Sequence, residues 1–184
     1  MVGIYIEPDV VKTLLDKCRA YITAYCRELK AIGATGVIMA EPAAGLLSNE
    51  DCQEYSTVYV RQIVEAVQDE NFAVILHNCG NKGQCTQAMI DSGAAALHFG
   101  NAVNMVETLE QCPSDLIVMG NIDPVGILKQ ATSEEVYRIT ADLLSKTSQY
   151  KNFVISSGCD MPPLVPDANI KAFYQAIADF NTGK

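Results

Sequence analysis

The chain has little basic charge. Its 13 lysine and arginine residues stand against 22 aspartate and glutamate residues, so the formal net charge is −9. A protein that binds a nucleic-acid backbone needs a basic surface, and no basic stripe is present here. We therefore expect no nucleic-acid partner. The acidic balance is typical of a soluble cytoplasmic protein.

Long apolar runs are also lacking. No run approaches the roughly 18 residues that a membrane span requires, and the opening residues, MVGIYIEPDVVK, lack the basic and apolar regions of a signal peptide. We therefore expect no membrane segment and a cytoplasmic location. The seven cysteines are an odd and scattered set, which indicates reduced thiols in such a chain, most of them packing residues.

The sequence motifs for nucleotide binding and for serine-type hydrolysis are missing. Neither GxGxxG nor GxxxxGK[ST] occurs, so nucleotide binding has no support from the sequence. The segment SSGC at residues 156–159 superficially resembles a nucleophile turn, but the GxSxG form is absent. The sequence therefore does not favour a serine or cysteine hydrolase.

Helical patterns alternate with five short apolar runs. The expected strands are residues 36–40, 72–76, 94–99, 115–120 and 153–156, and the expected helices are residues 9–31, 48–68, 84–91, 104–111, 132–146 and 167–180. This alternation is typical of parallel βαβ units, and strands that are apolar throughout are expected where both sheet faces are covered. We predict one α/β domain. Five units are too few for a complete barrel of about 250 residues, and a doubly wound sheet would suit the length.

Polar residues and a cysteine directly follow the expected strands. They are Glu41, His77, Asn121, Asp123 and Cys159. The carboxyl ends of parallel strands are where barrels and open α/β sheets both carry their sites. We therefore take these residues as the candidate site.

His77 and Cys79 form a His-x-Cys pair at the end of one expected strand. Because side chains alternate along a strand, the two lie on one face while Asn78 points away. With Cys159 they offer three metal ligands and leave room for a fourth, which is typical of catalytic zinc. The alternative is that His77 is a hydrogen-bonded strand-end histidine and the cysteines are packing residues.

Each of the other candidates has more than one interpretation. Glu41 is a displaceable fourth ligand, a substrate contact or an exposed loop acid, and Asp160 orients a ligand or is a plain loop acid. In the segment GNIDP, either Asn121 or Asp123 faces the substrate, or both simply form a turn. His98 lines the cavity or is a buried or half-buried strand residue with one hydrogen-bond partner.

Three segments, VILHNCG, GNIDP and ISSGCDMPPLVP, resemble the uroporphyrinogen decarboxylase superfamily over about residues 9–180. More narrowly they resemble its zinc branch, the methylcobamide:thiol methyltransferases. The decarboxylases end their last strand with Gly-His-Gly and lack the His-x-Cys pair, whereas this chain has Gly158-Cys159. The resemblance implies that residues 1–184 are a single partial-barrel domain, the C-terminal part (about five βα units) of a TIM (β/α)8 barrel.

The resemblance also implies a function. His77, Cys79 and Cys159 bind Zn²⁺, which ionises a small thiol such as coenzyme M, and this thiolate takes a methyl group from a methylcobamide (corrinoid) held by a separate corrinoid protein, as in methanogenesis. The alternatives are a decarboxylase-like tetrapyrrole enzyme and a non-catalytic zinc- or corrinoid-binding module. Because the first three barrel units are missing, we expect either that the chain is a fragment or that a partner, a second copy or a separately encoded N-terminal half, covers the exposed strand edges.

Overall fold

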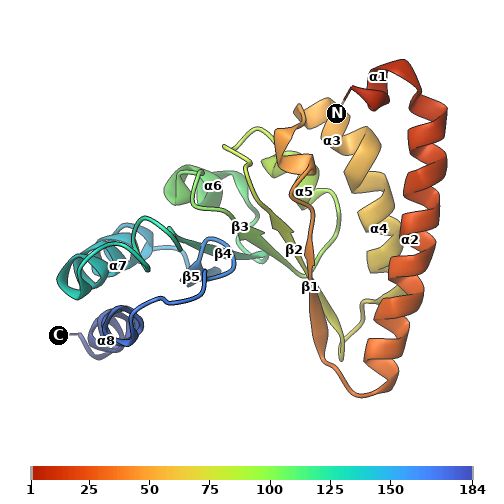
Figure 1. Cartoon of the computed structure of the whole chain (residues 1–184). Coiled ribbons are helices and arrows are strands. Elements are labelled where there is room, and N and C mark those ends of the chain that lie inside the picture. Colours follow the sequence, from red (N-terminus) through yellow and green to blue (C-terminus); the bar gives the residue numbers. More distant parts are fainter. Residues whose placement is uncertain (1, 184) are drawn as a thin grey trace. The chain divides into compact units, whose positions relative to one another are not determined.

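The computed structural model describes residues 2–183 and divides at Leu97 into two compact units (Figure 1). The first runs up to Leu97 and the second begins at His98. The chain forms a parallel α/β sheet with the strand order β1-β2-β3-β4-β5. That one domain spans residues 1–184 remains a prediction.

The first unit contains two of the strands and most of the helices. Its elements are α1 (Gly3–Ile6), α2 (Pro8–Ala31), β1 (Gly36–Ala40), η1 (Ala44–Leu46), α3 (Asn49–Cys52), η2 (Gln53–Thr57), α4 (Val58–Val67), β2 (Ala73–Asn78) and α5 (Thr86–Ile90). The long helix α2 lies beside α4 (Figure 1). Strand β1 pairs in parallel with β2, from Gly36 opposite Ala73 to Ala40 opposite His77.

Local sequence explains the helix boundaries in this unit. Helix α2 begins with Pro8, whose fixed φ suits a first turn. The expected helix over residues 48–68 forms as α3, η2 and α4 in succession, and the Ser48 side chain accepts a hydrogen bond from the Asp51 backbone amide at its start. The sequence did not predict α1 or η1, which are each too short to show a periodicity.

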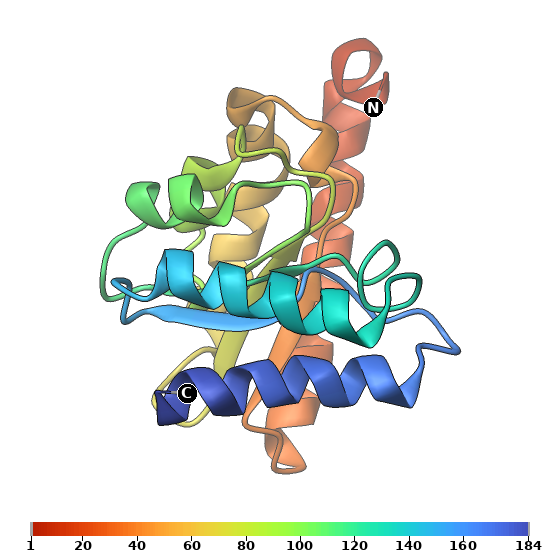
Figure 2. The same ribbon diagram turned by 90° about the vertical axis from the view of Figure 1, so that its left-hand side faces the viewer.

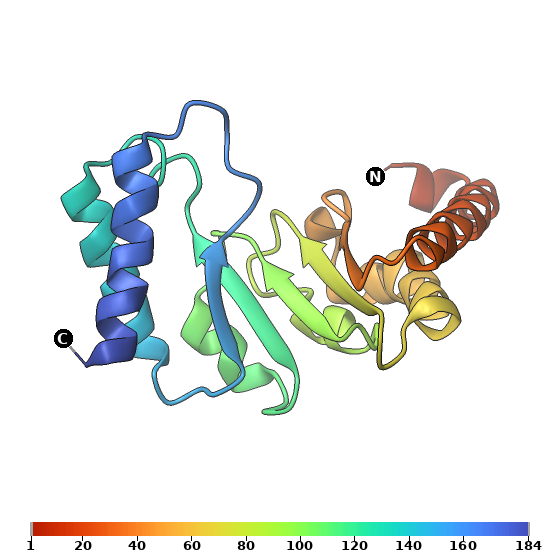
Figure 3. The same cartoon turned by 90° about the horizontal axis from the view of Figure 1, so that it is seen from below.

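Strand β3 (Ala96–Phe99) crosses the division, and the second unit continues with α6 (Met105–Gln111), β4 (Ile117–Ile122), α7 (Ser133–Thr147), β5 (Phe153–Ser157) and α8 (Asp167–Thr182). Strands β4 and β5 pair in parallel. Helices α7 and α8 lie side by side and run opposite to β5 (Figures 2 and 3). A capping box of Thr132 and Glu135 is present at the start of α7.

All five expected strands are present, but three of them continue further than expected, β5 by one residue. Strand β2 includes His77, and β4 includes Asn121. The prediction that these two residues follow their strands is therefore wrong. We predicted the end of a strand from the end of its apolar run. The backbone hydrogen-bond ladder, however, continues as long as the neighbouring strand offers a partner.

The prediction that the strands are covered on both faces holds only in part. Val74 and Leu76 of β2 are buried, whereas Ile38 of β1 is 64% exposed and Val154 of β5 is 44% exposed. These two are the outermost strands of the described sheet, so the prediction is wrong for them.

Within the described residues, no helix is both long and apolar enough to span a bilayer.

Candidate functional site

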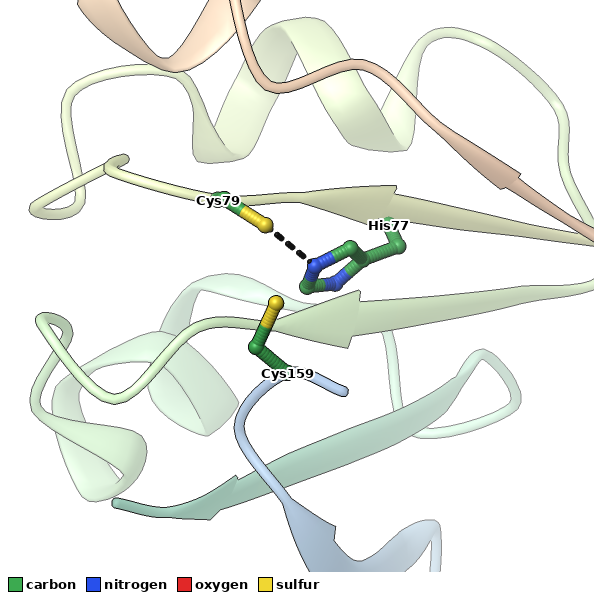
Figure 4. Close-up of side chains that lie close together, drawn as sticks. All are labelled: His77, Cys79 and Cys159. Atoms are coloured by element: carbon green, nitrogen blue, oxygen red, sulfur yellow. Dashed lines mark hydrogen bonds between the residues drawn. The ribbon is translucent and has the colours of Figure 1, made fainter. Parts of the chain in front are cut away.

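The His-x-Cys pair lies at the end of β2. His77 is buried, with 5% of its surface exposed, and Cys79 directly follows the strand. The His77 Nε2 atom lies 2.5 Å from the Cys79 Sγ atom, and the two side chains point toward each other (Figure 4). This confirms that they share one face of the strand. An imidazole nitrogen and a cysteine sulfur so placed can both bind one transition-metal ion.

Asn78, between these two residues, points away from them and is fully buried. Its Nδ2 donates a hydrogen bond to Glu41 Oε1 at 3.1 Å, and the Ser56 hydroxyl donates to Glu41 Oε2. Glu41 follows β1, and its backbone amide donates to the His77 carbonyl at 2.9 Å. The interpretation of Glu41 as an exposed loop acid is therefore wrong, because its carboxyl group is half-buried and paired.

Burial raises the pKa of Glu41 above its usual range, while the hydrogen bonds from Ser56 and Asn78 act in the opposite direction. The sequence analysis found Glu41 but missed Asn78. The one available signal was that Asn78 stands on the face of β2 opposite to His77, the face that also carries the apolar Val74 and Leu76, where a buried polar side chain needs a partner.

In the second unit, Cys159 follows β5 by two residues and is half-buried (Figure 4). The preceding residue, Gly158, donates its backbone amide to the Ile122 carbonyl at 2.8 Å. A Cβ atom at Gly158 would lie 2.6 Å from the Asn101 backbone nitrogen, so this position needs glycine for a close approach. The neighbouring Asp160 is exposed.

Asn121 and Asp123 are used by their own loops. The Asn121 Nδ2 donates to the carbonyls of Gly100 and Val103, at 3.2 and 2.9 Å. Asp123 Oδ1 accepts from the backbone amides at 125 and 126. These contacts support the turn interpretation of the segment, and a contact of either side chain with substrate stays a prediction.

His98 is half-buried on β3, as one of its two interpretations expected. Its Nε2 lies 2.9 Å from the Ser156 hydroxyl and 2.8 Å from the Ser157 carbonyl oxygen. Since both partners belong to β5, His98 links two strands of the sheet within the second unit.

Most cysteines outside the candidate ligand set are packing residues, as predicted. Cys26, Cys52, Cys85 and Cys112 are buried, whereas Cys18 is exposed on α2. Burial raises the pKa of each buried thiol, that of Cys112 to about 11. These thiols therefore stay neutral at physiological pH, unlike metal ligands, which must be thiolates.

Cys112 makes stability depend on pH in the alkaline range. Its ordinary pKa is 9.0 and its folded pKa is about 11. Above pH 9 the unfolded chain releases this proton while the folded chain keeps it, so we expect the free energy of unfolding to fall until the pH passes 11. One thiol contributes at most about 1.4 kcal/mol per pH unit. Urea unfolding at several pH values should give a shallower decline for Cys112→Ala than for the wild type.

The exposed Cys18 provides the control for this measurement. Cys18→Ala should leave the alkaline decline unchanged, because that thiol meets water in both states. Equal slopes for the wild type and Cys112→Ala would contradict the assignment of the decline to Cys112.

A comparison with protein families matches the uroporphyrinogen decarboxylase (URO-D) family over residues 3–180. The methylcobamide:CoM methyltransferase MtbA of Methanosarcina acetivorans is 26% identical over 180 residues, which cover 97% of this chain and 52% of that protein. The uroporphyrinogen decarboxylase of Psychromonas ingrahamii is also 26% identical, over 96% of this chain and 50% of its own length. The chain thus spans about half the length of these relatives.

A solved structure agrees with the fold. A methyltransferase from Methanosarcina mazei superposes with a TM-score of 0.87 over 98% of this chain and 52% of its own, at 21% sequence identity. This similarity supports the predicted fold, a set of βα units that corresponds to about half of a TIM barrel.

Proposed function

The chain belongs to the uroporphyrinogen decarboxylase family, and we propose that it is one of that family's methyltransferases. In this proposal it moves a methyl group from a methylated corrinoid to a zinc-activated thiol such as coenzyme M. The observation that carries this proposal is the His77–Cys79 pair, whose Nε2 and Sγ atoms face each other at the end of β2. The methylcobamide:CoM methyltransferases among the relatives support it at the level of the family.

The proposed metal ligands are His77, Cys79 and Cys159. His77 and Cys79 belong to the first unit and Cys159 belongs to the second. One imidazole and two thiolates suit Zn²⁺ and leave a fourth position open, which is the pattern of a catalytic rather than a structural zinc. The proposal includes the placement of Cys159 beside the pair of the first unit.

Zinc bound there would hold a substrate thiol as its thiolate, a nucleophile at neutral pH. The chain's own residues have simpler tasks. To bind the metal, His77 would have to be neutral, with the Nε2 lone pair directed at the ion, and Nε2 is the ring nitrogen that lies near Cys79 Sγ. The burial of His77 would keep water away from its side of the metal position. In the proposed reaction the thiolate sulfur would attack the methyl carbon of the corrinoid substrate, and the electron pair of the broken carbon–cobalt bond would stay with the corrinoid.

The remaining candidates have weaker roles in this proposal. Asp160 is exposed and could contact the substrate or the corrinoid protein. Glu41, Asn121 and Asp123, in contrast, already form hydrogen bonds with other residues of this protein. Their contacts with substrate are therefore secondary. The corrinoid protein and a second copy or separate half of the barrel are the proposed partners.

Two alternatives remain as different functions. A tetrapyrrole decarboxylase is favoured by the decarboxylases among the relatives, which have the same identity as the methyltransferases. The His-x-Cys pair argues against it. A non-catalytic zinc- or corrinoid-binding module is favoured by the length, since the chain spans about half of those relatives.

The test is demethylation of free methylcobalamin by the purified, zinc-loaded protein, followed by the change in its absorption spectrum. We expect demethylation that requires a thiol, with coenzyme M and homocysteine run side by side to identify the preferred acceptor. A protein that binds zinc but does not demethylate would be a binding module. A protein that binds no zinc would rule out the proposed mechanism.

A further inference from the structure

Asn78 is held on the face of β2 opposite to the candidate ligands. It is fully buried, and its Nδ2 donates to Glu41 Oε1. Glu41 also donates its backbone amide to the His77 carbonyl, so it contacts β2 at two consecutive residues. The Ser56 hydroxyl donates to the second oxygen of the carboxyl group and thereby fixes its orientation. The backbone between His77 and Cys79 is therefore anchored from behind.

Gly45 of η1 closes the other side of this backbone. A Cβ atom at position 45 would lie 2.0 Å from the Cys79 carbonyl oxygen and 2.5 Å from Asn78 Oδ1. Real Cβ atoms do not approach backbone so closely, so only glycine fits here. The Gly45 carbonyl also accepts a hydrogen bond from Gln84 Nε2 at 2.9 Å, which links η1 to the loop that follows Cys79.

The buried Asn78 side chain makes an unfavourable contribution to the free energy of folding. Its Oδ1 is buried and has no hydrogen-bond partner among the described residues. An unpaired buried acceptor destabilises the fold, and an apolar side chain of similar size would avoid that penalty. A strand that needed only packing at this position would be better served by an apolar residue.

We propose that Asn78, Glu41 and Gly45 are positioning residues that hold the backbone of residues 77–79 so that His77 Nε2 and Cys79 Sγ face one metal ion. This inference rests on the proposed function, since it concerns the same metal position. It assigns Glu41 a task behind the ligands rather than at the metal. Groups that orient a metal ligand typically change metal affinity about 10–100-fold when they are removed.

The test compares the zinc affinity of variants, measured by competition with a chelator, and the thiolate absorption bands of the cobalt(II)-substituted protein. Asn78→Ala and Glu41→Ala should each weaken zinc binding about 10–100-fold and shift the cobalt bands. Glu41→Gln should restore both, because an amide can accept from Asn78 and donate to Ser56. Gly45→Ala should behave like Asn78→Ala.

Gly3→Ala is the matched control for Gly45→Ala, because its new Cβ would meet nothing closer than 3.4 Å. It should leave zinc affinity and spectra unchanged. Circular dichroism shows whether each variant is folded, and the Glu41 variants decide the question if Gly45→Ala does not fold. Wild-type affinity and spectra in both Asn78→Ala and Glu41→Ala would overturn the proposal.

Loss of binding in Glu41→Gln as well as Glu41→Ala would also overturn it, because Glu41 would then act as a ligand itself. A wild-type protein that binds no zinc would instead show that the proposed function is wrong. The two failures are therefore distinguishable.

Discussion

Replacing Cys159 with serine should lower the bound zinc from about one ion per chain to a small fraction, because zinc would keep only two of its three protein ligands. A serine hydroxyl is not ionised at neutral pH and is a far weaker zinc ligand than a thiolate. The loss of affinity should exceed the roughly 10–100-fold change expected for a residue that only orients a ligand. Metal analysis after dialysis measures it, and thiol-dependent demethylation of methylcobalamin should fall in parallel.

Cys18→Ser is the matched control for this substitution, since Cys18 is an exposed cysteine on α2 and is not one of the proposed ligands. It should retain the zinc content of the wild type. Full zinc content in Cys159→Ser would mean that Cys159 is not a ligand, and the pair in the first unit would then have to bind a metal without it.

Phe72→Ala should cause a large loss of stability in the first unit. Phe72 is 1% exposed, just before β2, and the Lys30 ammonium lies 5.6 Å from the centre of its ring. Removing a buried aromatic side chain leaves a cavity and costs about 3–5 kcal/mol. This is a large part of the about 5–15 kcal/mol that stabilises a typical domain, so the urea midpoint should shift strongly.

Phe180→Ala makes the same change on α8, where the side chain is 41% exposed. Its effect on the free energy of unfolding should be clearly smaller, because water already reaches much of the ring. Equal effects of the two substitutions would contradict the burial of Phe72 in the core.

The sequence predicted the order of elements well. The limits of β1 are those expected, and α2, α6 and α7 lie within one or two residues of the expected limits. These elements have strong local signals, such as an apolar run that begins at a glycine and ends before Glu41-Pro42, a proline at the first turn and the capping box of Thr132 and Glu135. The ends of β2 and β4 were placed too early because the ladder with a neighbouring strand, which is not local, determines them.

The arrangement of His77 and Cys79 was determined by the sequence alone, because alternation along a strand is a property of the backbone and needs no knowledge of the rest of the fold. The environment of that pair was decided only by the tertiary structure. Glu41 reaches Asn78 across 37 positions of the chain because β1 and β2 pair with Ala40 opposite His77. Gly45 is needed because η1 packs directly on Cys79. Such contacts depend on strand register and on close packing between distant segments, and neither leaves a local pattern in the sequence.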